Sequence, residues 1–186
     1  MINRRNLLLS LSAALTTAAL PATSMAQASP SALKIERSLS AAPSRKLSHN
    51  KRILRKELRR RKDIRDLAPS IDLQDINFEF GSARIPRREF WKIENIADAM
   101  HAMGRRRSQI FLIEGHTDAV GSHYNNQKLS QARARSLKRI LVRNFGIEPW
   151  TLETIGFGEE YLLVPTLRAD WRNRRVTLRR VTDLIR

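Results

Sequence analysis

An unbroken run of four large apolar residues at 110–113 (Ile-Phe-Leu-Ile) constrains the fold of this chain more than any other feature of its sequence. Such a run is typical of a central strand that is buried on both faces of a sheet. It lies between two stretches, 86–104 and 126–144, in which apolar residues recur at helical spacing. A buried strand between two amphipathic helices predicts a layer of helices packed on a sheet.

Three further segments complete the pattern. Residues 76–80 alternate apolar and polar side chains, as a half-buried strand does, and residues 152–155 and 176–181 are short strand-like segments. The order is then strand, helix, strand, helix, strand, strand. This βαβαββ order predicts an α+β fold, a two-layer α/β sandwich with a mixed sheet and its helices on one face. The sequence places this domain at 71–186.

The first 28 residues resemble a bacterial export signal. Arg4 and Arg5 precede an uncharged stretch rich in Leu and Ala at 7–20, and residues 26–28 (Ala-Gln-Ala) give a small-x-small cleavage pattern. The apolar stretch is shorter than the roughly 20 residues of a comfortable membrane span. The sequence therefore predicts a signal peptide at 1–28, of the general or the twin-arginine type, and a location in the periplasm or at the outer membrane. An uncleaved anchor in the inner membrane is the alternative.

Positive charge is concentrated between this signal and the domain. The chain has 35 Lys and Arg against 18 Asp and Glu, a net charge of +17, and residues 45–62 hold ten of the cations with Glu57 as their single carboxylate. Such a chain is expected to bind an anionic partner. Residues 29–70 are predicted to be a Ser/Ala/Pro-rich linker and a basic segment, partly helical or disordered. The basic segment is either a solvated tether or an anchor for anionic lipids or lipopolysaccharide. Nucleic acid is not expected, because no aromatic residue within the segment could stack on a base.

The residue types argue against an enzyme and against a metal site. The chain has no cysteine, which excludes a disulfide, a thiolate-bound metal and a thiol nucleophile. His116, Asp118, Ser122, His123 and Ser130 lie close enough in sequence to suggest a hydrolase triad. Neither serine lies in a Gly-x-Ser-x-Gly motif, however, and the sequence contains no His-Glu-x-x-His pair. We expect no catalysis, no cofactor and no metal.

One charged residue lies on the apolar face of the second predicted helix. Arg133 falls between Leu129 and Leu137 on that face. Burial of an arginine is costly unless a carboxylate meets it, and the nearest candidate is Asp118, just after the central strand. A plain salt bridge between Asp118 and Arg133, or an arginine that extends to solvent, would satisfy this requirement. Alternatively the two charges act separately, Asp118 on an ammonium and Arg133 on a carboxylate, and the ligand is a zwitterion such as an amino-acid centre.

Four motifs occur in a fixed order: Gly115-His116-Thr117-Asp118, Asn126-x-x-Leu129-Ser130-x-x-Arg133-Ala134, Gly156-x-Gly158-Glu159 and Asn173-Arg174-Arg175-Val176. Through them, residues 73–182 resemble the OmpA-like peptidoglycan-binding domain. The resemblance implies non-covalent binding of peptidoglycan at the diaminopimelate of its peptide stem, which would anchor an envelope protein to the cell wall.

The resemblance also implies roles for single residues. Asp118 and Arg133 would hold the free amino-acid end of diaminopimelate. Asn126 and Leu129 would line the pocket, Thr117 would flank it and Arg174 would approach from the last strand. The sequence alone does not rank Arg174 against Arg175. The alternative function is an envelope adhesin that binds anionic lipid or lipopolysaccharide through the basic segment 45–62.

Overall fold

The structure is a computed structural model that describes residues 29–74, 76–79, 81–105 and 108–186. The predicted signal peptide lies outside the described residues. None of the helices in the described part of the chain is both long enough and apolar enough to cross a membrane.

Four strands form one mixed sheet in the order β1-β4-β2-β3. Their bounds are β1 (Ser70–Leu73), β2 (Phe111–Gly115), β3 (Leu152–Gly156) and β4 (Val176–Arg180). β2 runs parallel to β3 and antiparallel to β4, and β4 runs antiparallel to β1. Every residue of β2 is buried, and β2 lies between two partner strands. The central position predicted from the apolar run is therefore confirmed.

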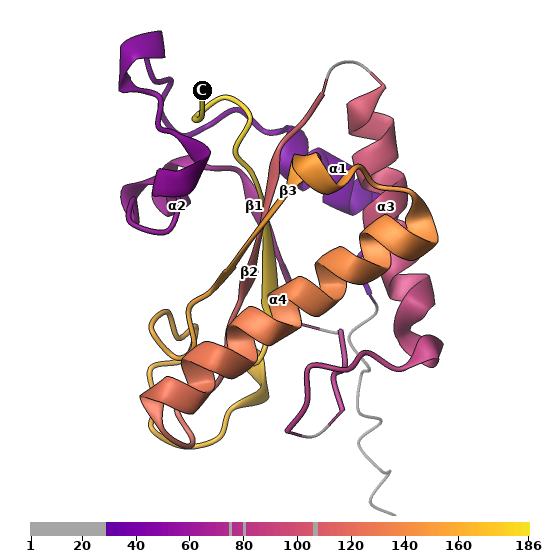
Figure 1. Ribbon diagram of the computed structural model, residues 1–186, viewed down its shortest axis with the longest axis vertical. Coiled ribbons are helices and arrows are strands. Elements are labelled where there is room, and N and C mark those ends of the chain that lie inside the picture. Colours follow the sequence, from indigo (N-terminus) through magenta and orange to yellow (C-terminus); the bar gives the residue numbers. More distant parts are fainter. Residues whose placement is uncertain (1–28, 75, 80, 106–107) are drawn as a thin grey trace, which may run out of the picture.

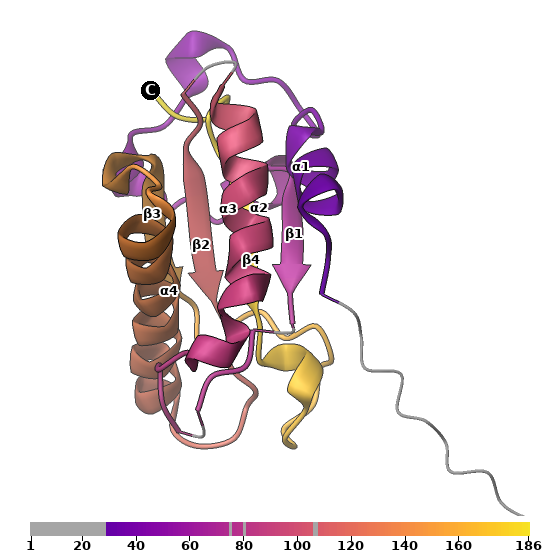
Figure 2. The ribbon, with the colours of Figure 1, turned by 90° about the vertical axis from the view of Figure 1, so that its right-hand side faces the viewer.

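Three helices cover one face of this sheet: α1 (Ala32–Ser40), α3 (Phe90–Gly104) and α4 (His123–Phe145). Figures 1 and 2 show them on the same side of the strands. The core between helices and sheet includes Ile93, Ile113, Leu137 and Leu178. The structure thus confirms the α+β sandwich, its βαβαββ order and the placing of the main helices on one face.

The first strand differs from the prediction. The sequence predicts a strand at 76–80, whereas β1 ends at Leu73 and residues 76–79 have no regular secondary structure. Ile76 is buried and Phe78 packs against the core, while Glu79 closes a turn by a backbone hydrogen bond to Arg84 O at 3.0 Å. The alternation of apolar and polar residues therefore reports burial of alternate side chains, but this segment pairs with no strand.

Residues 32–40, predicted as linker, form α1 and pack on the domain. The Ser31 side chain caps this helix by accepting a hydrogen bond from Lys34 N at 3.3 Å. Ile35 and Leu39 are fully buried in the core beside α3. The packed part of the chain thus begins well before residue 71. The sequence pattern missed this helix because only two apolar residues of its nine are buried.

The basic segment 45–62 also packs on the domain, as part of a longer stretch that ends with the short α2 (Asp63–Leu67). It crosses the sheet face opposite the three helices (Figure 1). Ile53 and Leu58 are buried there against Leu112 and Ile155, and Ile53 forms a β-bridge with Ile185. Two buried side chains among ten cations give too weak a pattern to predict a packed segment. They are nevertheless enough to hold the segment on the sheet.

Candidate functional site

A cleft of about 570 Å³ opens where β2 ends and α4 begins. All six residues selected from the sequence line it: Thr117, Asp118, Asn126, Leu129, Arg133 and Arg174. They come from the turn after β2, from α4 and from the segment before β4. The structure therefore brings together residues that lie 57 positions apart between the first and the last.

The turn from β2 into α4 is held by its own polar groups. Val120 N donates a hydrogen bond to Asp118 Oδ1 at 3.3 Å, and the Ser122 side chain caps α4 by accepting from Asn125 N at 3.2 Å. The buried Asn126 amide donates to Asp118 O at 3.3 Å and Val120 O at 3.2 Å. Asn126 therefore fixes the backbone of the turn that carries Asp118, as a capping residue does for a helix end.

Asp118 is paired with Arg174 and not with Arg133. Arg174 Nη1 donates to Asp118 Oδ2 at 2.7 Å, and the Arg174 side chain is 44% exposed. Arg133 Nε donates to the backbone oxygen of Ser82 at 3.2 Å instead. In the described part of the chain no carboxylate lies within ion-pair distance of Arg133. The plain Asp118–Arg133 salt bridge, one of the alternatives that the sequence left open, is therefore wrong.

The positive charge of the buried Arg133 side chain is not neutralised by an ion pair in the described part of the chain. The residue is 8% exposed, and its guanidinium lies over the Phe78 ring at 4.9 Å from the centroid. Burial lowers the pKa of the Arg133 guanidinium, the charge of Arg174 lowers it further, and the Asp118 carboxylate acts in the opposite direction. Because arginine keeps its proton in proteins, the cleft wall holds a positive charge that favours an anionic guest.

The apolar part of the cleft was not selected from the sequence. Ile76, Phe78, Val120 and Trp171 line it together with Leu129. Phe78 and Ile76 were assigned to a strand, and nothing in the sequence indicated that this segment borders α4. The cleft thus combines the acidic residues Asp118 and Glu79 and the arginines Arg133 and Arg174 with an apolar wall. This is the usual composition of a site for a small polar ligand that has an aliphatic part.

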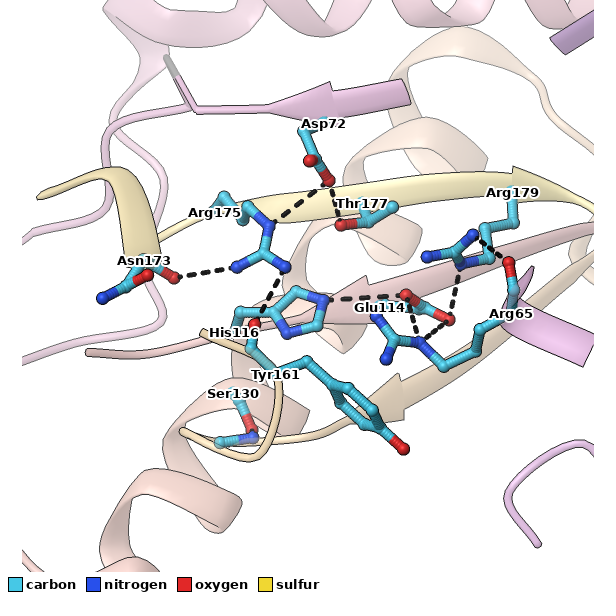
Figure 3. Close-up of polar contacts among 11 residues, drawn as sticks. Arg65, Asp72, Glu114, His116, Ser130, Tyr161, Asn173, Arg175, Thr177 and Arg179 are labelled. Atoms are coloured by element: carbon cyan, nitrogen blue, oxygen red, sulfur yellow. Dashed lines mark hydrogen bonds and ion pairs between the residues drawn. The ribbon is translucent and has the colours of Figure 1, made fainter. Parts of the chain in front are cut away.

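Arg175, the neighbour of Arg174, belongs to a different environment. Figure 3 shows it in a network of charges on the far side of the sheet from α4. Arg175 Nε lies 3.3 Å from Asp72 Oδ1, and Arg175 Nη2 donates to Tyr161 O at 3.0 Å. The structure therefore ranks the two arginines, since Arg174 lines the cleft and Arg175 does not.

Glu114 is the centre of this network and is fully buried. Its Oε1 lies 3.2 Å from Arg65 Nε and 2.9 Å from Arg179 Nε. Burial alone would raise the pKa of Glu114, but the nearby His116 ring and the charges of Arg179 and Arg65 outweigh burial and hold that pKa below its ordinary value. Arg65 comes from α2, so the network also ties the N-terminal part of the chain to the sheet.

The serine and histidine side chains do not form a triad. Ser130 Oγ donates to Gln127 O at 3.0 Å and accepts from Gly158 N at 2.8 Å. Ser122 serves as a helix cap. His116 Nε2 lies 3.6 Å from Glu114 Oε2, slightly beyond hydrogen-bond distance, and faces no serine hydroxyl in the described part of the chain (Figure 3). The described residues also contain no group of three or more that could hold a metal ion.

The sequence of this chain is similar to those of several known proteins. The family model described as the OmpA family matches residues 77–175, which include all six residues of the cleft named above. Outer membrane porin F of Pseudomonas aeruginosa is 35% identical over 104 residues, which are 55% of this chain and 29% of the porin. The peptidoglycan-associated lipoprotein of Pseudomonas putida is 31% identical over 105 residues, which are 55% of this chain and 60% of that protein. The chain thus spans less than two thirds of the length of these curated relatives.

Solved structures agree on the fold. A putative MotB-like protein from Desulfovibrio vulgaris is 27% identical with a TM-score of 0.52, and the match covers 62% of this chain and 74% of that one. A periplasmic domain of Helicobacter pylori MotB has a TM-score of 0.54 at 22% identity, covering 62% of this chain and 77% of that one, and shares the fold. Because the family model covers more than half of the sequence, from residue 77 to residue 175, this chain belongs to the OmpA family.

Proposed function

We propose that this protein binds peptidoglycan non-covalently in the cleft between β2 and α4 and thereby anchors an exported envelope protein to the cell wall. The ligand group is the free amino-acid end of diaminopimelate in the peptide stem. One observation carries the proposal: the Asp118 carboxylate and the Arg133 guanidinium lie in one cleft without pairing with each other. Membership of the OmpA family and the name of the Pseudomonas putida relative, a peptidoglycan-associated lipoprotein, support the same ligand.

The charges of the cleft match those of an amino-acid centre. The ligand ammonium would bind Asp118, where it shares the carboxylate with Arg174 or displaces it, and the ligand carboxylate would bind Arg133. Thr117 lines the same cleft, and its buried Oγ1 has no hydrogen-bond partner among the described residues. Leu129 gives an apolar wall to the aliphatic chain of diaminopimelate.

The affinity expected for one such contact is modest. Hydrogen bonds to charged groups contribute about 1.5–3 kcal/mol each, and ordering the ligand offsets part of that gain. A single stem is therefore expected to bind with a Kd between about 1 µM and 1 mM. Such weak contacts serve an anchor well, since a polymer wall offers many copies of the ligand.

Co-sedimentation with purified sacculi tests the site. Asp118→Asn and Arg133→Gln are each expected to weaken binding at least tenfold, because each leaves one charge of the ligand unpaired (~1.4 kcal/mol or more). Arg87→Gln, which removes an exposed cation outside the cleft, is the matched control and should bind as the unchanged protein does. Circular dichroism verifies that all variants are folded. Full binding by both cleft variants would refute the proposed site.

A second comparison tests the ligand itself. Sacculi that carry lysine in place of diaminopimelate keep the side-chain ammonium and lack the second carboxylate. The protein is expected to bind them much more weakly, because Arg133 then has no partner. Equal binding to both kinds of sacculi would leave wall binding in place but refute diaminopimelate as the recognised group.

We further propose that the protein acts by binding alone, in the periplasm or at the outer membrane. The hydroxyl group of Ser130 is engaged by the backbone of neighbouring turns and His116 is buried, which supports this view. Incubation with sacculi should release no soluble muropeptide. Release that requires His116 or Ser130 would show an enzyme.

A further inference from the structure

The outer face of α4 carries an unusual set of charges. This 23-residue helix contains six Lys and Arg and no Asp or Glu. Arg133 faces the cleft, but Arg135, Arg139 and Arg143 follow one another at intervals of four residues and are exposed. Like charges at this spacing repel each other and destabilise a helix. This row of arginines therefore does not stabilise the helix, and we expect that it binds a partner.

The row borders a groove of about 420 Å³. Four cations and three other residues line it: Arg135, Lys138, Arg139, Val142, Arg143, Pro149 and Thr154. No carboxylate of the described chain lies within ion-pair distance of these cations. Lys138 Nζ donates to Leu152 O at 2.6 Å, and Arg139 donates to Ser136 Oγ at 3.2 Å. The guanidinium groups of Arg135 and Arg143 contact no polar partner in the part of the chain that the structure describes.

Two cations of the basic segment extend the groove. Arg59 Nη2 donates to Gln131 Oε1 at 2.6 Å, one turn of α4 before Arg135. Arg55 Nη1 donates to Trp150 O at 2.5 Å, and its guanidinium lies 5.9 Å from the Trp150 ring centroid. We call the resulting surface the cationic face, and it consists of Arg55, Arg59, Arg135, Lys138, Arg139 and Arg143.

We propose that the cationic face binds the phosphate headgroups of an anionic lipid membrane. Five of its six cations are arginines, whose planar guanidinium groups bind phosphate oxygens in pairs. Val142 and Pro149 give the groove an apolar floor, and Trp150, which follows Pro149, is 50% exposed. Exposed tryptophan beside cationic residues suits the interface between headgroups and hydrocarbon.

The structure favours this face over the basic segment alone. In residues 45–62, Arg61 and Lys62 are paired with Asp63 and Glu160. Arg55, which belongs to the cationic face, also has a carboxylate partner, since its Nη1 lies 3.6 Å from Glu153 Oε1. Those carboxylates offset part of the charge that the sequence assigned to a membrane anchor. The three arginines of α4 have no such partner among the described residues, and a helix holds them in one row.

The cationic face lies away from the cleft. The cleft is at the N-terminal end of α4, where Asp118 and Asn126 lie, and the groove is lined by the C-terminal half of the helix. The two sites share no lining residue. Membrane binding is therefore independent of the proposed wall binding, and either proposal can fail without the other.

Vesicle co-sedimentation of the full chain tests the cationic face. The vesicles contain phosphatidylglycerol in phosphatidylcholine, and pure phosphatidylcholine vesicles are the lipid control. The triple variant Arg135→Gln, Arg139→Gln, Arg143→Gln is expected to bind the anionic vesicles about 100-fold more weakly, since each cation near an anionic surface contributes roughly a factor of five. Its binding to sacculi should not change.

The matched control removes the same amount of charge elsewhere. Lys34→Gln, Arg37→Gln and Arg87→Gln neutralise three exposed cations outside the groove and the cleft, and this variant should keep most of its vesicle binding. Equal loss in the two triple variants would show that only net charge matters and would overturn the proposal. Loss of sacculus binding in the α4 variant would assign the face to the wall instead, and equal binding to vesicles whose negative charge comes from fatty-acid carboxylates would overturn the preference for phosphate.

Discussion

Two glycines at the ends of β2 and β3 set how closely α4 approaches the sheet. A Cβ atom on Gly115 would lie 2.1 Å from Ser130 O, and one on Gly156 would lie 2.2 Å from Gln131 N. Both contacts are with the backbone of α4, which cannot move aside as a side chain can. The same helix carries Asn126, Leu129 and Arg133, so these glycines also determine where one wall of the cleft lies.

We predict that Gly115→Ala destabilises the protein by about 2–4 kcal/mol, because α4 must shift or the strand must bend to admit the methyl group. Urea denaturation measures the loss. Gly104→Ala is the control, since a Cβ there meets no atom within 4 Å and the residue lies in α3. Alanine favours a helix over glycine, so this control should be neutral or stabilising by up to about 1 kcal/mol. Equal stability of both variants would contradict the close packing.

His116 is predicted to make stability depend on pH. Burial is the largest cause that lowers the pKa of His116 below its ordinary 6.5; Glu114 opposes it, and Arg175 and Arg65 add to it. Below about pH 6.5 the unfolded chain then binds a proton that the folded chain does not. The free energy of unfolding should therefore fall as the pH decreases from about 6.5 toward the folded-state pKa.

His116→Gln should reduce this pH dependence, whatever it does to stability at neutral pH. The measurement is the difference in unfolding free energy between about pH 7.5 and about pH 5.5, a window that isolates histidine. Glu114 should contribute little, because its pKa is held below its ordinary 4.5. His49→Gln, at an exposed position, should leave the difference unchanged. A slope unaffected by His116→Gln would count against a neutral buried imidazole.

Among the elements, the segment that crosses the sheet face opposite the three helices is packed on the domain and is not a free linker. Ile53 is 2% exposed, lies against Leu112 and Ile155 and bridges to Ile185. We predict that Ile53→Ala costs about 2–4 kcal/mol, the range for truncating a large buried aliphatic residue. Leu33→Ala in α1, at a residue 62% exposed, is the control and should change stability by less than about 0.5 kcal/mol. Denaturant titration distinguishes the two, and no loss for Ile53→Ala would mean that the segment is a tether after all.

The elements that sequence predicts well are those with a dense pattern of buried residues. β2 begins with a continuous apolar run, α3 buries six of its 15 residues and α4 buries seven of its 23. The sequence predicts a strand that begins six residues after the start of β1, because Ile76 is buried and Phe78 packs against the core although neither pairs with a strand. α1 and the segment around Ile53 were missed because few of their side chains reach the core.

The candidate site follows the same rule, since only its residues that lie in a regular local pattern could be predicted from that pattern. The stripe on α4 identified Arg133, and its mismatch with apolar neighbours pointed to Asp118 as a second charge. The pairing of Asp118 with Arg174 spans 56 residues and depends on how β4 is placed beside β2, so no local pattern indicates it. The apolar wall that includes Phe78 and Trp171 also comes from segments without regular pattern. A charged residue on the apolar face of a helix can thus be recognised from the sequence, whereas the residue that pairs with a given charge depends on the fold.

On the scale of the whole molecule, α4 connects two surfaces of different chemistry. A helix of 23 residues is about 34 Å long. The cleft at its start holds Asp118 and Arg133, whose opposite charges are not paired with each other, and the cationic face along its second half is open to a large anionic surface. If both proposals hold, one protein can contact the wall and a membrane at the same time.

We therefore predict that the full chain carries phosphatidylglycerol vesicles into the pellet of sedimented sacculi. Asp118→Asn should abolish this bridging while vesicle binding persists, and the triple α4 variant should abolish it while sacculus binding persists. Rising salt should release the vesicles first, because exposed charges are screened beyond a Debye length of about 8–10 Å near physiological ionic strength, whereas the partly buried charges of the cleft are screened less. Two results would show that the two surfaces do not act as separate contacts: bridging that survives either variant, or release of the protein from the sacculi at a lower salt concentration than release of the vesicles.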